Sequence, residues 1–104
     1  MIEISPQKVV HVIFQTREGG AGRALEAFIA TLNDDEKAHL VALAWIGRGA
    51  FEPEDYAEAV DTALSEASTP TEQYLMGMPH LAENLEAGLE AMGIDVTRAE
   101  EDFL

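Results

Sequence analysis

The chain has 104 residues without cysteine, 47% of them hydrophobic, and a formal net charge of −14. This length holds one domain with a single core, and the missing cysteines exclude disulfides, thiolate metal sites and a cysteine nucleophile. The negative charge repels nucleic acid and anionic membranes, so neither is expected as a direct partner, while basic protein surfaces are attracted.

The first expected helix covers residues 6–17. Ser5 followed by Pro6 is a typical N-cap with proline at the first helical position. The apolar side chains from Val9 to Phe14 cover a wider arc than a short peripheral helix needs. Their β-branched members also permit a strand, and that alternative stays open. The glycine-rich residues 18–22 then form a connection.

Two further helices are expected at residues 23–32 and 34–46. The earlier one has a single apolar stripe, formed by Leu25, Phe28, Ile29 and Leu32. Asn33 followed by Glu36 has the sequence of a capping box, which starts the later helix. Since that helix is apolar on all sides, we expect it at the centre of the fold.

The rest of the chain predicts three helices. Pro53 starts one of them, and its inner face holds Tyr56, Val60, Ala63, Leu64 and Ala67. Thr69 and Glu72 read as a second capping box, which opens a short helix ending near Gly77. The last helix ends in a left-handed cap at Gly93. Its inward face is formed by Leu81, Leu85, Leu89 and Met92.

Together these patterns predict an all-α fold. We expect a single compact domain of five or six short helices packed round the buried central helix at residues 34–46. The domain covers residues 1–94, and residues 95–104 are expected to form a flexible acidic tail. No signal peptide opens the chain and no apolar run reaches the ~20 residues that span a bilayer, so a cytoplasmic location is expected.

The run from Leu32 to Tyr56 resembles the core motif of DUF3775, a bacterial family named as a domain of unknown function. Residues 44–49, Ala-Trp-Ile-Gly-Arg-Gly, are the most specific part of the likeness. The likeness spans residues 2–94, although Gly19–Gly22 stand where relatives tend to carry a longer acidic insertion. The resemblance implies a shared fold and assigns no activity. Further similar positions are residues 4–9 and 74–79, Leu85, Gly88 and Leu89.

The motifs that would indicate a catalytic or cofactor site are incomplete. Residues 18–23 precede a helix but lack the Gly-Lys-Ser/Thr ending of a phosphate-binding loop. Residues 47–53 offer one carboxylate, Glu52, where a calcium loop needs alternating oxygen ligands. A helix-turn-helix reading fails because the following helix is acidic, whereas DNA binding needs a basic one. We therefore predict no catalytic residues and no cofactor.

The three histidines, His11, His39 and His80, have no metal-binding spacing within one helix. A metal-dependent enzyme would require at least two of them to converge with carboxylates from different helices. We predict no metal site, and keep this convergence as the least favoured alternative.

Charge is divided unevenly along the chain. Residues 1–51 hold five basic and six acidic residues, whereas residues 52–104 hold fourteen acidic residues and only Arg98, a net charge of −13. We predict a non-enzymatic protein-interaction module whose acidic face binds a basic protein surface, with a nucleic-acid mimic as one form of it. The alternative use of this charge is solubility alone. The predicted face consists of Glu54, Glu58, Asp61, Glu83, Glu86 and Glu90.

A second functional alternative starts from the first helix. If the excess apolar arc from Val9 to Phe14 is not needed inside the chain, two or more copies could bury it between them. The protein would then be a small structural homo-oligomer.

Overall fold

The computed structural model describes residues 3–18, 22–66 and 69–95. Within these ranges the backbone forms six α-helices and one short 3-10 helix, η1, and no strand. The helices are α1 (Pro6–Arg17), α2 (Gly22–Ala30), α3 (Asp34–Arg48), η1 (Pro53–Asp55), α4 (Tyr56–Ser65), α5 (Thr71–Met76) and α6 (Leu81–Ala91). The prediction of an all-α fold is confirmed, and the strand alternative for the first segment is wrong.

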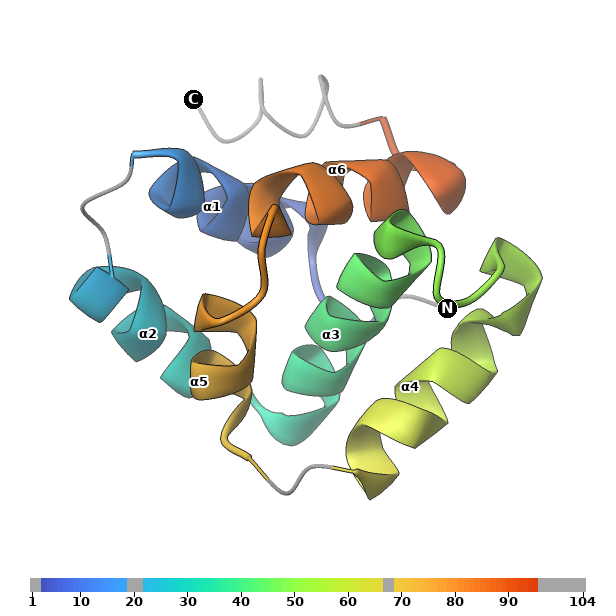
Figure 1. The fold of residues 1–104 in the computed structure, drawn as a ribbon, viewed down its shortest axis with the longest axis horizontal. Coiled ribbons are helices and arrows are strands. Elements are labelled where there is room, and N and C mark those ends of the chain that lie inside the picture. The colour runs from blue at the N-terminus through green and yellow to red at the C-terminus, as the bar shows by residue number, and fades with distance from the viewer. Residues whose placement is uncertain (1–2, 19–21, 67–68, 96–104) are drawn as a thin grey trace.

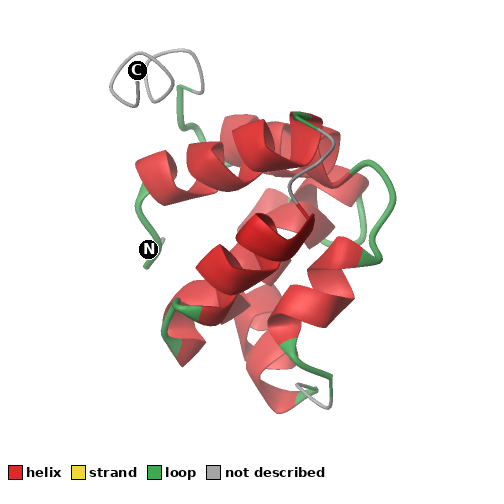
Figure 2. Cartoon of the chain, turned by 90° about the vertical axis from the view of Figure 1, so that its left-hand side faces the viewer, coloured by secondary structure: helices red, strands yellow, loops and turns green. Residues whose placement is uncertain are grey.

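Helix α3 lies at the centre of the molecule, as the sequence predicts (Figure 1). It packs extensively against α6 and α4, while α1 packs against α6 and α2, and α2 against α5. Helices and the loops between them account for the whole described chain (Figure 2). None of these helices is long and apolar enough to cross a membrane. The buried residues of α3 are Ala38, His39, Leu40, Val41, Ala42, Leu43, Ala44 and Ile46.

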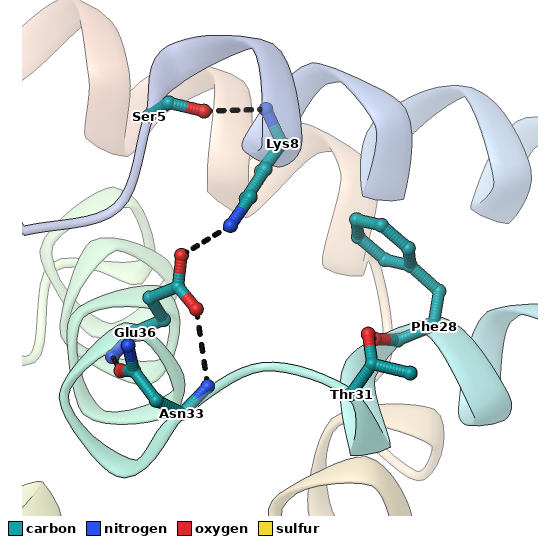
Figure 3. A network of polar contacts seen from close by, with 6 residues as sticks. All are labelled: Ser5, Lys8, Phe28, Thr31, Asn33 and Glu36. Carbon is teal, nitrogen blue, oxygen red and sulfur yellow. Dashed lines mark hydrogen bonds and ion pairs between the residues drawn. The ribbon is translucent and has the colours of Figure 1, made fainter.

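The starts of α1 and α3 are capped and joined to each other (Figure 3). The backbone N–H of Lys8 donates to Ser5 Oγ over 3.2 Å. In α3, the Glu36 N–H donates to Asn33 Oδ1 over 2.7 Å, and the Asn33 N–H donates to Glu36 Oε1 over 3.0 Å. Lys8 Nζ completes the network by pairing with Glu36 Oε2. Both predicted caps are confirmed, and the Lys8 and Asn33 hydrogen bonds lower the pKa of the Glu36 carboxyl.

The apolar arc of α1 is buried inside the chain. The side chains of Val9, Val10, Val12 and Ile13 are 0% exposed, and Phe14 is half-buried. Because α1 lies between α6 and α2, it needs apolar residues on more than one face. This packing accounts for the arc from which the homo-oligomer alternative was inferred.

The backbones of α3 and α6 touch where the two helices cross. A β-carbon on Gly88 would lie 2.9 Å from the carbonyl carbon of Leu43 and closer still to its oxygen. One on Gly47 would lie 2.7 Å from the carbonyl carbon of Asn84 and closer still to that oxygen. Real β-carbons do not come within 3.0 Å of such atoms, so only glycine allows this crossing.

Left-handed glycines end both of these helices. Gly49 has φ 86° and Gly93 has φ 82°, and each is followed by a residue whose N–H bonds five residues back. These bonds join Ala50 to Trp45 and Ile94 to Leu89, both over 2.9 Å. The predicted cap at Gly93 is confirmed. The central helix extends two residues beyond the predicted range of about 34–46, since Gly47 and Arg48 continue it and Gly49 is its C-cap.

Three local expectations for the second half need correction. Pro53 opens η1, and α4 begins only at Tyr56. Leu64 was expected on the inner face, but it is 44% exposed. The second capping box does not form: α5 begins one residue later than the box requires, which makes Pro70 its N-cap, and proline has no side-chain acceptor. Ala67 and the predicted tail beyond Asp95 lie outside the described residues.

Candidate functional site

Three of the exposed acidic side chains on α4 and on the 3-10 turn before it belong to the predicted face. Glu54 belongs to η1, and Glu58 and Asp61 follow on α4. No lysine or arginine among the described residues forms an ion pair with any of the three. We call Glu54, Glu58 and Asp61 the α4 acidic patch. Their carboxylates are available to a cation from another molecule.

The three acidic residues predicted on α6 have different surroundings. Glu83 and Glu90 are exposed, and Glu83 Oε1 lies 4.0 Å from His80 Nδ1. Glu86 instead accepts hydrogen bonds at both carboxylate oxygens from the Arg17 guanidinium, one of them over 2.9 Å. This bidentate ion pair joins α6 to α1. Glu86 therefore has a partner inside the chain, and its role there is to hold α1 in place.

The six predicted residues do not form one continuous face. Both α4 and α6 pack on α3, but they lie on different sides of it, and no extensive contact joins them in the described structure (Figure 1). Helical periodicity shows correctly that the side chains point outward, with Glu86 as the exception. It cannot show how two helices are turned relative to each other. The structure thus separates the α4 acidic patch from the exposed pair Glu83 and Glu90.

The three histidines lie in three different environments. The His11 ring packs on Phe28 of α2 with 4.2 Å between ring centroids, and His80 is exposed beside Glu83. His39 is buried in α3 with 6% of its surface exposed. Within residues 3–18, 22–66 and 69–95, no group of three or more histidine or acidic side chains is arranged to hold a metal ion.

His39 of α3 accepts hydrogen bonds from a residue before α1 and from the first residue of α4. Its Nδ1 accepts the backbone N–H of Glu3 over 3.2 Å and lies 2.6 Å from the Tyr56 hydroxyl. Because Nδ1 accepts, the neutral ring carries its proton on Nε2, and the Tyr56 hydroxyl donates. Burial lowers the pKa of His39 and raises the pKa of Tyr56, so both groups stay neutral near pH 7. This arrangement fastens the residues before α1 to α3 and α4.

A second feature of the molecular surface is a groove between α3, the end of α4 and the start of α5. It consists of two adjoining hollows of about 280 Å³ and 200 Å³ that share Val41, Ala63 and Thr71. Trp45 and Tyr74 line the larger hollow, and Leu64 lines the smaller one. We call this the α3–α4–α5 groove. The remaining lining residues are Asp34, Lys37, Ala38, Glu66 and Thr69.

The sequence did not reveal this groove. Trp45 is half-buried: it packs against the core and also lines the larger hollow. Leu64 was placed inside because it continues the apolar pattern of α4. Tyr74 lies on a helix of six residues, too short to show an inner and an outer face. One signal was present, since a tryptophan with a polar tip often lies where apolar surface meets water.

Comparison with known families places the chain. A family model described as "Protein of unknown function (DUF3775)" matches residues 22–94. The chain belongs to this family. No curated protein and no solved structure matches the chain. The predicted resemblance to DUF3775 is confirmed over the matched residues, while the likeness at residues 2–21 stays a prediction.

The matched DUF3775 region extends from α2 to the end of α6. It contains the two acidic surfaces, the α3–α4–α5 groove and the glycine crossing. In residues 44–49, the most specific part of the resemblance, Gly47 forms the crossing with α6 and Gly49 ends α3. Trp45 lines the groove on another side of the same helix. In this chain, residues 44–49 thus combine two backbone requirements with one half-buried aromatic side chain.

Proposed function

We propose that this protein is a non-enzymatic interaction module whose exposed carboxylates bind a basic protein surface. The observation that carries the proposal is that five of the six predicted carboxylates on η1, α4 and α6 have no arginine or lysine partner among the described residues. Of these six, only Glu86 forms an ion pair with an arginine or lysine of the described residues. The α4 acidic patch and the pair Glu83 and Glu90 are open to a partner.

The physical consequence is a surface that attracts cations over a distance. Unpaired exposed carboxylates raise the rate of encounter with a basic partner and suppress encounters with acidic ones. The Debye length is about 8 Å at 0.15 M salt and becomes shorter as the salt concentration rises. The attraction weakens once the Debye length is shorter than the distance between the opposite charges. A partner held mainly in this way dissociates when the salt concentration rises.

The test is affinity capture of the tagged protein from its native host at about 50 mM and about 300 mM salt, followed by mass spectrometry. We expect a stoichiometric basic protein that is retained at low salt and lost at moderate salt. If duplex DNA or RNA displaces it, the protein acts as a nucleic-acid mimic. A partner that persists unchanged at moderate salt contradicts the electrostatic proposal.

Two charge-reversal variants of equal net charge locate the contact. Glu58→Lys with Asp61→Lys changes the α4 acidic patch, and Glu18→Lys with Glu26→Lys changes exposed residues after α1 and on α2. We expect the first variant to lose the partner and the second to keep it. Equal loss in both would mean that only total charge matters, and no specific surface would be supported.

A further inference from the structure

The α3–α4–α5 groove holds exposed apolar side chains that the acidic surface alone does not account for. Among the described residues, Leu64, Tyr74 and Met76 are the exposed large hydrophobic residues, at 44%, 37% and 38%. Two of them, Leu64 and Tyr74, line the groove. Scattered exposed hydrophobic residues are ordinary, but two that line adjoining hollows of one groove indicate a binding surface.

The aromatic wall of the groove is held in a fixed geometry. The Trp45 indole N–H donates to the Tyr74 hydroxyl oxygen over 2.8 Å, and the two rings meet edge to face. Phe51 stacks on Trp45 with 5.6 Å between ring centroids and 24° between planes. Since Tyr74 uses its oxygen to accept, its own hydroxyl hydrogen remains to donate to a bound group. Such a wall needs little reordering on binding.

The shape of the groove suits two neighbouring side chains of a partner. It is divided into two adjoining hollows of about 280 Å³ and 200 Å³. Each hollow can take one large apolar side chain. A helix that lays two such side chains into neighbouring hollows is a common mode of peptide recognition.

The charges around the groove favour a basic occupant. Asp34 and Glu66 line it, and Lys37 is the single cation lining the two hollows. Asp61 of the α4 acidic patch precedes Leu64 by three residues on α4, so charge and apolar contact meet on neighbouring turns. A segment that combines lysine or arginine with large apolar side chains would satisfy both surfaces at once.

We infer that the α3–α4–α5 groove binds a basic amphipathic segment of a partner protein, with one apolar side chain of that segment in the hollow lined by Trp45 and Tyr74 and another in the hollow lined by Leu64. This inference rests on the proposed function and adds the feature that gives it specificity. Charge brings the partner to the surface, and the groove selects segments with an apolar anchor.

The experiment uses three synthetic peptides of about 18 residues, five helical turns, without aromatic residues. The first is an amphipathic lysine–leucine peptide. The second has serine in place of leucine, and the third has glutamate in place of lysine. Trp45 is the chain's only tryptophan, so its fluorescence reports directly on the groove. We expect a saturable change with the lysine–leucine peptide and at least about tenfold weaker binding of the other two.

Leu64→Ser and Met76→Ser form a matched pair of protein variants. Both remove a similarly exposed hydrophobic side chain, but only Leu64 lines the groove. We expect Leu64→Ser to weaken binding of the lysine–leucine peptide about tenfold, and Met76→Ser to change it less than about twofold. Equal losses in the two variants would overturn the assignment to the groove.

Other results separate this inference from the proposal on which it rests. If the lysine–serine peptide binds as tightly as the lysine–leucine peptide, without a Trp45 response, the groove is wrong and the acidic surface stands. If the glutamate–leucine peptide binds as tightly, the basic occupant is wrong. If the protein is a dimer that Leu64→Ser converts to a monomer, the groove holds a second copy, and the inference is overturned.

Discussion

The two sides of α3 are built on different principles. Toward α6, Gly47 and Gly88 bring the two backbones into contact, and no room remains for a single added carbon. Toward α4 and α5, the same helix borders hollows of about 280 Å³ and 200 Å³, with Leu64 and Tyr74 partly open to solvent. The α6 side is packed for stability, and the α4–α5 side leaves apolar surface uncovered.

This difference indicates where the chain tolerates change. A close backbone crossing cannot expand without moving whole helices, since protein interiors are packed as densely as organic crystals. A lined hollow at the surface can lose or gain side-chain atoms at little cost to folding. Substitutions toward α6 should therefore act on stability, and substitutions in the groove on binding.

The largest expected effect is at the crossing. Gly88→Ala puts a β-carbon into the backbone of Leu43, so the helices must separate, and we expect a loss of about 3 kcal/mol or more in the free energy of unfolding. Urea denaturation followed by circular dichroism measures it. Gly77→Ala is the control, because its β-carbon would meet atoms no closer than 3.7 Å and should change stability by less than about 0.5 kcal/mol.

A smaller effect is expected at the start of α3. Asn33→Ala removes the acceptor for the Glu36 N–H, and we expect a loss of about 1 kcal/mol. Because the lost hydrogen bond caps the first turn of α3, amide hydrogen exchange should become faster in that turn first. This turn contributes Asp34 and Lys37 to the groove. Uniform loss of protection along α3, including the crossing at Gly47, would contradict the separation of the two sides.

The pH dependence of stability tests the α4 side through His39. Burial lowers the pKa of His39 below 6.5, so the imidazole of the folded protein takes up a proton less readily than that of the unfolded chain. The contribution of neutral His39 to the free energy of unfolding is complete above the pKa of the unfolded chain. It is lost as the pH falls toward the pKa of the folded protein. We expect a modest loss between about pH 7.5 and pH 5.5, measured as a shift of the urea midpoint.

His39→Gln should flatten this pH dependence, because glutamine can still accept a hydrogen bond but does not titrate in this range. His80→Asn is the control. His80 is exposed and has φ 57°, a conformation that asparagine tolerates, so His80→Asn replaces a histidine without disturbing the fold. A slope that follows His80 instead would show that His39 is not the group responsible.

The smallest expected effect on folding is at Leu64. Leu64→Ser removes a side chain that is already 44% exposed, so the free energy of unfolding should change by less than about 0.5 kcal/mol. Leu85→Ala, on the α6 side and 0% exposed, should cost about 2–5 kcal/mol in the same assay. Similar losses in the two variants would remove the distinction between the two sides.

Features set by neighbouring residues were predictable from the sequence. The capping box at Asn33 and the left-handed cap at Gly93 depend on residues within one turn, and both are observed. The central position of α3 also followed, because a helix apolar on every face can only be surrounded. Thr69 failed as a cap because the same pattern allows α5 to begin one residue later, after Pro70.

Features set by distant residues were not predictable. The partner of Glu86 is Arg17, 69 positions away, and a periodic pattern on α6 holds no information about it. In the sequence, Gly47 is typical of a helix end. Only the fold shows that it lies inside α3, against the backbone of Asn84 and Gly88 in α6. The groove depends on how α4 ends against α3, which also decided that Leu64 lies outside the core.

The position of α1 has a consequence for the limits of the folding unit. The family match begins at residue 22, yet Val9, Val12 and Ile13 of the preceding helix are completely buried against the matched part. A fragment starting at residue 22 would expose the surface of α6 and α2 that α1 covers, and would lose the Arg17–Glu86 pair. We therefore expect a fragment limited to the matched residues 22–94 to be less stable than the chain that includes α1.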